Sequence, residues 1–203
     1  MKVKILFITL LISLSSFCQI IKVKHLAYEI TFDTKIKEPL YTHYILKKSM
    51  LHGKIKRASF TKDPLIQNEL QASDSDYEGF YKIYDKGHLT PYDDMCLKVS
   101  LSKESMYISN TAPEASSLNR GIWLNIEDYV RVLAESYDIE VWTGCIYENS
   151  TEKAGSLIVP TFYWKLIKYD NKYEAFKAQN IPPKLKNIND YKVNEQELLK
   201  LIK

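Results

Sequence analysis

Alternating apolar and polar positions predict a sheet of short strands in this chain. In the segment 28–32 (YEITF), apolar side chains occupy every second position, which is the period of a half-buried strand. Further apolar runs, bounded by glycine, proline or polar turn residues, have the same character. The expected strands are 28–32, 41–46, 106–110, 139–143, 157–159 and 162–167.

The segment Asn119–Tyr137 has the pattern of an amphipathic helix. Its apolar residues recur at spacings of four, four and three, which places them on one helix face. They are Ile122, Ile126, Val130 and Leu133. Shorter helices are expected near 93–95 and at 195–203, and 61–77 is expected to be a loop. The predicted fold class is α+β, an antiparallel-rich central sheet with one prominent helix packed on it.

Residues 1–18 have the order of a secretory signal peptide. A positively charged start precedes the apolar run 5–14, which is shorter than the roughly 20 residues that span a bilayer, and small residues follow up to Cys18. We expect cleavage after Cys18, export to the periplasm or the medium, and a single domain over residues 19–203. The alternatives are a lipid anchor on Cys18 and a buried N-terminal element.

The charge of the chain bears on whether it binds nucleic acid, and its cysteine content bears on disulfides and zinc sites. The chain has 28 basic and 25 acidic side chains, and two of the basic ones lie in the N-terminal segment, so the exported part is nearly neutral. Overall charge therefore does not by itself argue for nucleic-acid binding. Cys96 and Cys145 remain after the predicted cleavage and could pair in an oxidising compartment, which the sequence leaves open. The spacing of the cysteines does not suggest a structural zinc site.

Three short motifs carry residues suited to phosphodiester hydrolysis. They are Tyr84–Pro91 (YDKGHLTP), Ser109–Pro113 (SNTAP) and Leu118–Trp123 (LNRGIW). The first contains His88, whose imidazole titrates near neutral pH and can act as a general base. The third contains Asn119, whose amide oxygen suits magnesium, an ion that commonly keeps several waters beside one or two protein ligands.

Other residues can complete such a site. Gly87 permits a sharp turn that would expose the neighbouring imidazole. Glu127 follows Asn119 on the same side of the predicted helix, roughly two turns later, and could accept hydrogen bonds from waters around a metal ion. Arg57 and Lys86 could bind the phosphate.

In these motifs the chain resembles the DNA/RNA non-specific endonuclease family, ββα-metal (His-Me finger) nucleases whose signature is Asp-Arg-Gly-His. Asp85–His88 (DKGH) is similar to that signature, Ser109–Pro113 to its Ser-Asn-x-x-Pro strand, and Leu118–Asn119 to the helix start that follows. Looser similarity extends upstream to Arg57 and downstream past Pro160. The resemblance implies a nuclease that cuts DNA and RNA, single- or double-stranded, with little sequence preference and leaves 5′-phosphate ends.

The resemblance also implies a role for each residue. His88 would be the general base that activates water. Asn119 would be the sole direct protein ligand of Mg²⁺, with Mn²⁺ as a substitute, and the ion would stabilise the leaving group. Glu127 would bind the waters of the metal ion. Asn110 would orient the active-site groups, including the His88 loop, and Arg57 would stabilise the developing phosphate charge.

One departure from the signature leaves an alternative open. Lys86 stands where the family has arginine, and it keeps the charge but lacks the planar two-pronged donor. We expect weakened activity; the alternative is a nucleic-acid-binding or partner-binding module that has kept the fold and lost the reaction. A serine hydrolase using His88 is disfavoured because no Gly-x-Ser-x-Gly motif is present. Asp85 is expected to brace its loop through hydrogen bonds to backbone donors.

Overall fold

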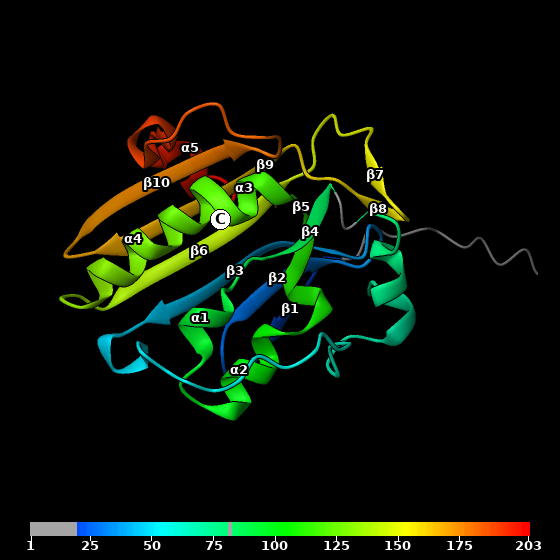
Figure 1. Cartoon of the computed structure of the whole chain (residues 1–203), viewed down its shortest axis with the longest axis horizontal. Helices are drawn as coiled ribbons and strands as arrows, with labels where there is room; N and C mark the ends of the chain where they lie inside the picture. Colours follow the sequence, from blue (N-terminus) through cyan, green and yellow to red (C-terminus); the bar gives the residue numbers. More distant parts are fainter. Residues whose placement is uncertain (1–19, 81–82) are drawn as a thin grey trace, which may run out of the picture.

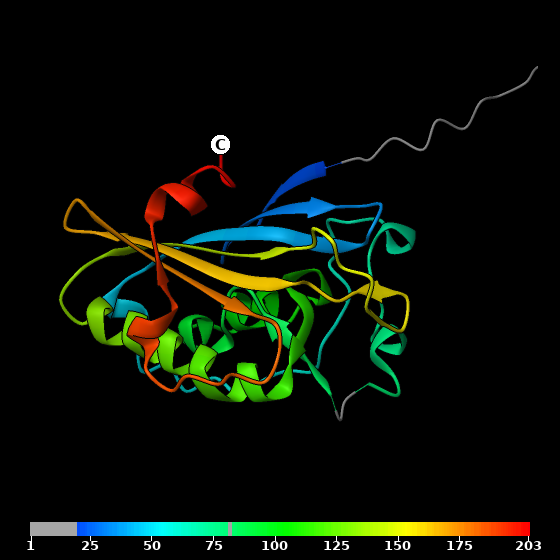
Figure 2. The same ribbon diagram turned by 90° about the horizontal axis from the view of Figure 1, so that it is seen from above.

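The computed structural model describes residues 20–80 and 83–203, and its centre is a seven-stranded sheet. The strand order is β1-β2-β3-β6-β9-β10-β11, and every neighbouring pair is antiparallel. Figure 1 shows helix α4 lying across one face of this sheet, and Figure 2 shows α5 on the opposite face. The strands are β1 Ile20–Lys24, β2 Glu29–Asp33, β3 Glu38–Leu46, β6 Ile139–Ile146, β9 Phe162–Tyr169, β10 Lys172–Gln179 and β11 Lys192–Val193.

A second, smaller unit lies in front of the sheet and carries the three sequence motifs. Strands β4 (Tyr84–His88) and β5 (Thr111–Ala115) pair antiparallel. The chain then passes directly into α3 (Ser116–Leu118), the wide turn η5 (Asn119–Trp123) and α4 (Leu124–Ala134). Two strands followed at once by a helix make a ββα arrangement, which brings the ends of the three motifs together (Figure 1). The α+β class is confirmed.

The main core lies between the sheet and α4. The helix directs Ile126, Val130 and Ala134 inward, all essentially inaccessible to solvent, as the predicted apolar stripe requires. Trp123 is fully buried at the start of the helix and meets the ring of Tyr163 edge-on, with centroids 5.7 Å apart. Since β9 is a strand, its neighbouring side chains point to the other face.

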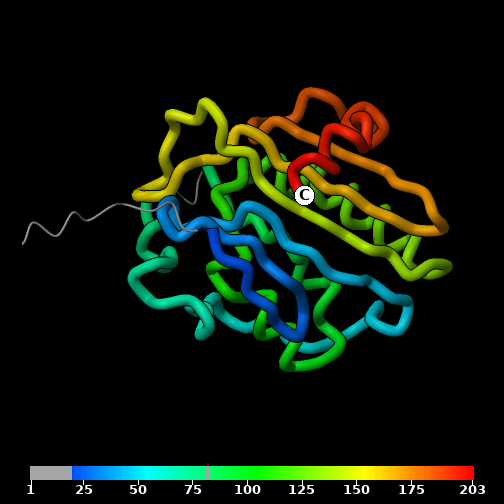
Figure 3. Tube along the Cα trace, turned by 180° about the vertical axis from the view of Figure 1, so that it is seen from behind, coloured from blue at the N-terminus to red at the C-terminus, as the bar shows by residue number. Residues whose placement is uncertain are grey.

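That other face has its own apolar cluster. Trp164 and Leu166 of β9 pack there with Ala175 of β10 and with Leu198 of α5 (Glu195–Leu199). Figure 3 shows the C-terminal segment crossing this face of the sheet. The sheet is therefore covered by helix on both sides, at least in its β9–β10 half.

Several predicted elements need correction. The segment 106–110 is not a strand: η4 (Ile108–Asn110) is a short 3-10 turn, and the strand begins at Thr111. The long helix begins at Leu124, because the backbone at Gly121 (φ −116°, ψ −112°) leaves the helical region.

Other elements were not predicted. Helix α2 and strands β1, β7, β10 and β11 are additional, whereas α1 and the β8 strand occur where they were expected. The terminal helix α5 ends earlier than the predicted 195–203. The remaining bounds are α1 Tyr92–Met95, α2 Val99–Ser105, β7 Lys153–Ala154 and β8 Leu157–Ile158.

The N-terminal and cysteine predictions have different outcomes. The predicted signal peptide, 1–18, lies outside the described residues. Cys96 and Cys145 are both buried free thiols, so the disulfide that the sequence left open is not formed. The Cys96 thiol donates to the carbonyl oxygen of Gly53, while Cys145 lies within β6 in the sheet.

Truncation of Trp123 tests the main core. We expect Trp123→Ala to lower the free energy of unfolding by about 3–5 kcal/mol, because it leaves a large cavity between α4 and the sheet. Urea unfolding followed by circular dichroism measures the change. The matched control is Val132→Ala on the exposed face of α4, where the side chain is 68% exposed and the expected change is within about 0.5 kcal/mol. Equal shifts in the two variants would contradict this packing.

Candidate active site

A cleft of about 210 Å³ lies between β4, the 51–60 segment and the start of α4. Four residues singled out from the sequence line it together: Arg57, His88, Asn119 and Glu127. They come from three separate stretches of chain: the segment that contains Arg57, the end of β4, and the continuous η5–α4 stretch that carries both Asn119 and Glu127. The other lining residues are Pro91, Tyr92, Asp93, Arg120 and Leu124.

His88 closes β4 and presents its ring to the cleft. One ring face stacks on Phe60, with centroids 5.2 Å apart. Nη2 of Arg57 lies 3.3 Å from both ring nitrogens. Burial lowers the pKa of His88, and the nearby guanidinium lowers it further, to about 3. The ring is therefore neutral at physiological pH, which is the state a general base requires.

Asn110 is completely buried, and its side chain forms hydrogen bonds with the backbone just after His88. Its Oδ1 accepts from the amide of Thr90 at 2.9 Å, and its Nδ2 donates to the Thr90 carbonyl at 2.9 Å and to the Ser105 carbonyl at 2.8 Å. Its own carbonyl accepts from the amide of Leu89. Asn110 thus does not reach the cleft, and it can act only by holding the loop that carries His88.

Asp85 joins β4 to the helix start by accepting hydrogen bonds from side chains. Its carboxylate accepts from Ser116 Oγ at 3.0 Å, from Asn119 Nδ2 at 2.9 Å and from Arg120 Nε and Nη2 at 2.8 and 2.6 Å. Burial raises the pKa of Asp85, but these donors outweigh it and hold the pKa below its ordinary value. The expected bracing role stands, with side-chain donors in place of the predicted backbone donors.

The bond to Asp85 also fixes which way the amide of Asn119 points. A carboxylate only accepts hydrogen bonds, so the group facing it must be the NH₂ of the amide. The amide oxygen of Asn119 is left as the acceptor toward the cleft. That oxygen is the atom a hard cation would use.

Glu127 is half-buried at the other side of the cleft, above a group of buried charges. Burial, with a smaller contribution from Asp94, raises its pKa to about 7, against the opposing effects of Lys165 and Arg131. Lys165 is 1% exposed, and its Nζ donates to Thr143 Oγ1 at 2.6 Å. Burial lowers the pKa of Lys165, against the pull of Glu127.

Gly87 is needed for space and not for a turn. It lies within β4 and has no positive φ, so the predicted sharp turn is wrong. A Cβ at this position would lie 2.2 Å from Glu114 Oε2 and 2.9 Å from the Tyr163 hydroxyl. The carboxyl of Glu114 is fully buried, neither oxygen has a hydrogen-bond partner in the described part of the chain, and burial raises its pKa well above the ordinary value.

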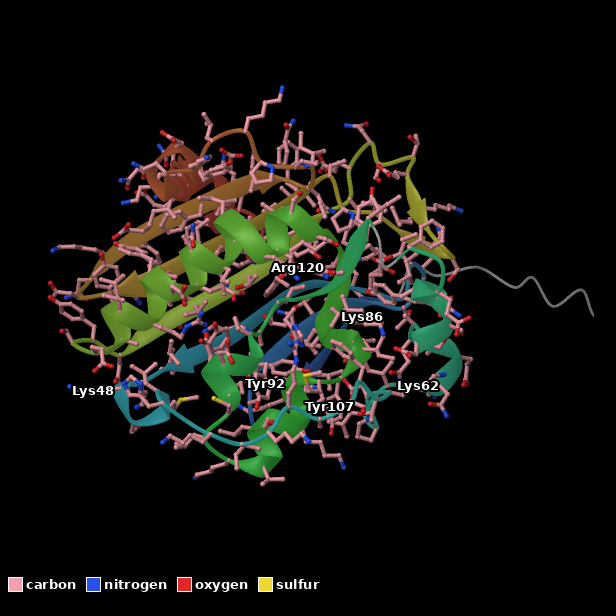
Figure 4. The ribbon with its side chains drawn as sticks, viewed as in Figure 1. Lys48, Lys62, Lys86, Tyr92, Tyr107 and Arg120 are labelled. Atoms are coloured by element: carbon pink, nitrogen blue, oxygen red, sulfur yellow. The ribbon has the colours of Figure 1, made fainter. Side chains whose placement is uncertain are left out.

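Lys86 points away from the cleft lining. Its ammonium pairs with Asp74 and lies over the rings of Phe60 and Tyr77, 4.9 and 5.3 Å from their centroids. The lining residues drawn from 20–80 and 83–203 do not include it. Figure 4 shows Lys86 on β4. The structure thus brings Lys86 beside the site, behind Phe60, and not into it.

Three residues near the site were missed from the sequence. Arg120 adjoins Asn119 in the third motif, and its charge could have drawn attention. Glu114 and Lys165 sit in apolar strand patterns, where a buried charged residue is itself a signal of function. Their convergence below the cleft depends on the pairing of β5 with β4 and of β9 with β6, which the sequence did not show.

The donor set fits one kind of metal ion. Among the described residues no group of three or more His, Cys, Asp or Glu side chains could hold a metal, so an all-protein cage is not the arrangement here. The amide oxygen of Asn119, with the carboxylate of Glu127 in the same cleft, suits a hard, largely hydrated ion such as Mg²⁺. Cysteine and methionine, the soft ligands, are not among the described residues that line this cleft.

Comparison with known proteins agrees with the geometry. The family model for DNA/RNA non-specific endonucleases matches residues 15–201. The chain belongs to this family. Among related proteins, the chain is 30% identical over 190 residues to the salivary endonuclease of Lutzomyia longipalpis, covering 78% of this chain and 46% of that protein. It is 29% identical over 174 residues to the nuclease of Serratia marcescens, covering 78% and 64%.

Human mitochondrial endonuclease G is 27% identical over 156 residues, covering 70% of this chain and 52% of that protein. The chain thus spans about half to two thirds of these relatives' lengths. A solved structure of the EndoG/EndoGI complex aligns with a TM-score of 0.79 at 23% identity, covering 88% of this chain and 82% of that chain. This confirms the predicted ββα-metal nuclease fold. Within the described residues, no helix is long and apolar enough to cross a membrane.

Removal of the Arg57 guanidinium should raise the pKa of His88. Burial is the larger cause of its low value, so the pKa in Arg57→Ala should rise from about 3 but remain below the ordinary 6.5. Because the folded-state pKa is lowered, the unfolded chain binds a proton in this window that the folded chain does not. Stability therefore falls as pH falls from 6.5 toward 3, and it falls less steeply in the variant.

NMR titration of the His88 ring protons measures this pKa directly. Arg57→Lys is the control, since it keeps a positive charge and should keep the pKa low. A His88 pKa that is the same in Arg57→Ala as in the native protein would show that the guanidinium has no such effect.

Proposed function

We propose that the protein is an exported, metal-dependent endonuclease that hydrolyses phosphodiester bonds of DNA and RNA without sequence specificity. The observation that carries this proposal is the convergence of His88 and Asn119 on one cleft, with Arg57 and Glu127 in the same lining. A base and a hard oxygen ligand in one solvent-accessible cleft, with a guanidinium beside them, are what hydrolysis of an anionic diester needs.

In this proposal each residue of the site has a separate role. His88 takes a proton from the attacking water, with its neutral state kept by burial and by Arg57. Arg57 donates to the phosphate oxygens, on which negative charge grows in the transition state. Glu127 accepts hydrogen bonds from waters in the cleft and orients them. Asn110 acts as a positioning residue, because it holds the backbone next to His88.

Asn119 would hold the metal ion through its amide oxygen, with Glu127 on the far side of the cleft. When bound, Mg²⁺ supplies charge neutralisation at the phosphate and at the leaving oxygen. Mn²⁺ prefers similar oxygen ligands and should substitute. Asp85 keeps the amide of Asn119 in the orientation that this role requires.

The one-domain arrangement is part of the same proposal. Residues 19–203 would form one nuclease domain, which is supported by a sheet that includes both Ile20 and Val193 and by a family match over residues 15–201. The weakened, purely nucleic-acid-binding alternative has one supporting observation. Lys86, at the position of the signature arginine, pairs with Asp74 and lies outside the cleft.

The proposed reaction is tested by incubating the purified protein with plasmid DNA and with RNA, in Mg²⁺ and in chelator. We expect both substrates to be cut only with the metal. His88→Ala should lower kcat by about 10²–10⁴-fold, because it removes the base, and Asn119→Ala should abolish the response to Mg²⁺. The matched control is His52→Ala, an exposed histidine paired with Glu135 outside the cleft, which should cut normally.

Two results would decide against the reaction. Intact DNA and RNA after incubation of the native protein with Mg²⁺ or Mn²⁺ would contradict the proposal. Tight binding of nucleic acid under the same conditions, without cleavage, would support the alternative of a binding module.

Export is tested by expressing the full chain in a bacterial host and measuring the mass of the protein recovered outside the cytoplasm. We expect a mature protein that begins at Gln19, because the small residues before it form the predicted cleavage site. Recovery in the membrane fraction with a lipid on Cys18 would favour the anchored alternative. An intact N-terminus in the cytoplasm would contradict export.

A further inference from the structure

Arg120 holds its guanidinium in a fixed orientation at the edge of the cleft. Nε and Nη2 donate to the two carboxylate oxygens of Asp85 at 2.8 and 2.6 Å, a two-pronged arrangement. The side chain is nevertheless 70% exposed. Within the described residues no acceptor bonds to Nη1, so an ordered donor edge faces solvent. An arginine fixed in this way has already lost much of its rotamer freedom before a ligand arrives.

Stability does not explain this arginine. The carboxylate of Asp85 already accepts from Ser116 and Asn119, so the β4–helix connection does not depend on Arg120. An ion pair with so exposed a partner contributes about 0–1 kcal/mol. Arg120 is itself one of the residues that line the cleft.

The second exposed guanidinium of the cleft belongs to Arg57. It lies against Tyr92, with its central carbon 5.5 Å from the ring centroid, and touches His88. Arg120 is instead bound to Asp85, on the Asn119 side. Figure 4 labels Tyr92 beside α1 and Arg120 beside the start of the long helix. Arg57 can bind a phosphate that is held near His88 and Asn119. Arg120 is then available to bind a second phosphate.

We propose that Arg120 binds the phosphate next to the scissile one, so that the site selects polynucleotide strands over diesters with a single phosphate. A nucleic-acid strand repeats its phosphates at about 3.4 Å of rise per nucleotide, so neighbouring phosphates enter one cleft together. The inference rests on the proposed function and extends it, because it states how much of the substrate the site recognises. Arg120 supplies a planar guanidinium whose Nη1 is still available after the two bonds to Asp85, whereas Lys86 lies outside the cleft lining.

The first experiment measures binding without catalysis. A fluorescent single-stranded oligonucleotide is titrated with the full chain in chelator over a range of salt concentrations. Arg120→Ala removes one phosphate contact. The slope of the logarithm of the association constant against the logarithm of salt concentration should therefore become less negative by about 0.7. The control is Lys24→Ala on β1, an exposed cation likewise paired with an acid, Glu29, at 2.9 Å, which should leave the slope unchanged.

An unchanged slope in Arg120→Ala, or an equal reduction in both variants, would overturn the proposal. Because the titration uses chelator, any effect of the substitution on metal binding by Asn119 does not enter the result.

The second experiment compares kcat/KM for an oligonucleotide with kcat/KM for bis(p-nitrophenyl) phosphate, which has one phosphate. Arg120→Ala should lower the ratio of the two values by about tenfold, the effect of one charged hydrogen bond. Arg120→Lys should lower it less. The ratio cancels any damage common to both substrates, so an unchanged ratio contradicts the proposal. Native protein that cuts neither substrate would instead contradict the proposed function, and the salt slope would still decide the role of Arg120.

Discussion

The site depends on one carboxylate, that of Asp85, which ties the end of a strand to the start of a helix. Without this link, β4 and the η5 turn would be connected only through the longer path of β5 and α3. The carboxylate faces three side-chain donors from Ser116, Asn119 and Arg120. It therefore sets the amide of Asn119 and the guanidinium of Arg120 at the same time. A single half-buried acceptor thus orders both the candidate metal ligand and a candidate phosphate donor.

Polar groups buried behind the cleft hold the reactive residues in place. Their burial costs free energy because it removes them from water. Asn110 is fully satisfied by backbone partners, so its burial costs little and fixes the His88 loop. Glu114 has no such partners within the described chain, and burial raises its pKa well above the ordinary value. Lys165 and Glu127 influence each other across the floor of the site. Such an arrangement is typical of functional sites, where polar groups are kept in spite of their cost to stability.

The candidate site was more predictable than the fold around it. Histidine, asparagine and glutamate stand in short motifs whose chemistry can be judged locally, and the structure brings His88, Asn119 and Glu127 into one cleft. Strand β1 was missed because it is an edge strand with mostly exposed residues, and apolar alternation is weak there. The segment 106–110 was misassigned because its buried residues pack on several sides, so burial there does not follow the period of a strand.

The sequence by itself determined the apolar stripe of α4, most sheet strands and the identity of the reactive side chains, because these depend on residue type and on spacing along the chain. Only the tertiary structure decided where Lys86 points, why Gly87 has no side chain and that Arg120 borders the cleft. Each of these depends on a neighbour far away in the sequence: Asp74 for Lys86, Glu114 and Tyr163 for Gly87, and Asp85 for Arg120. Contacts of this kind are set by strand pairing and helix packing, which no local pattern specifies.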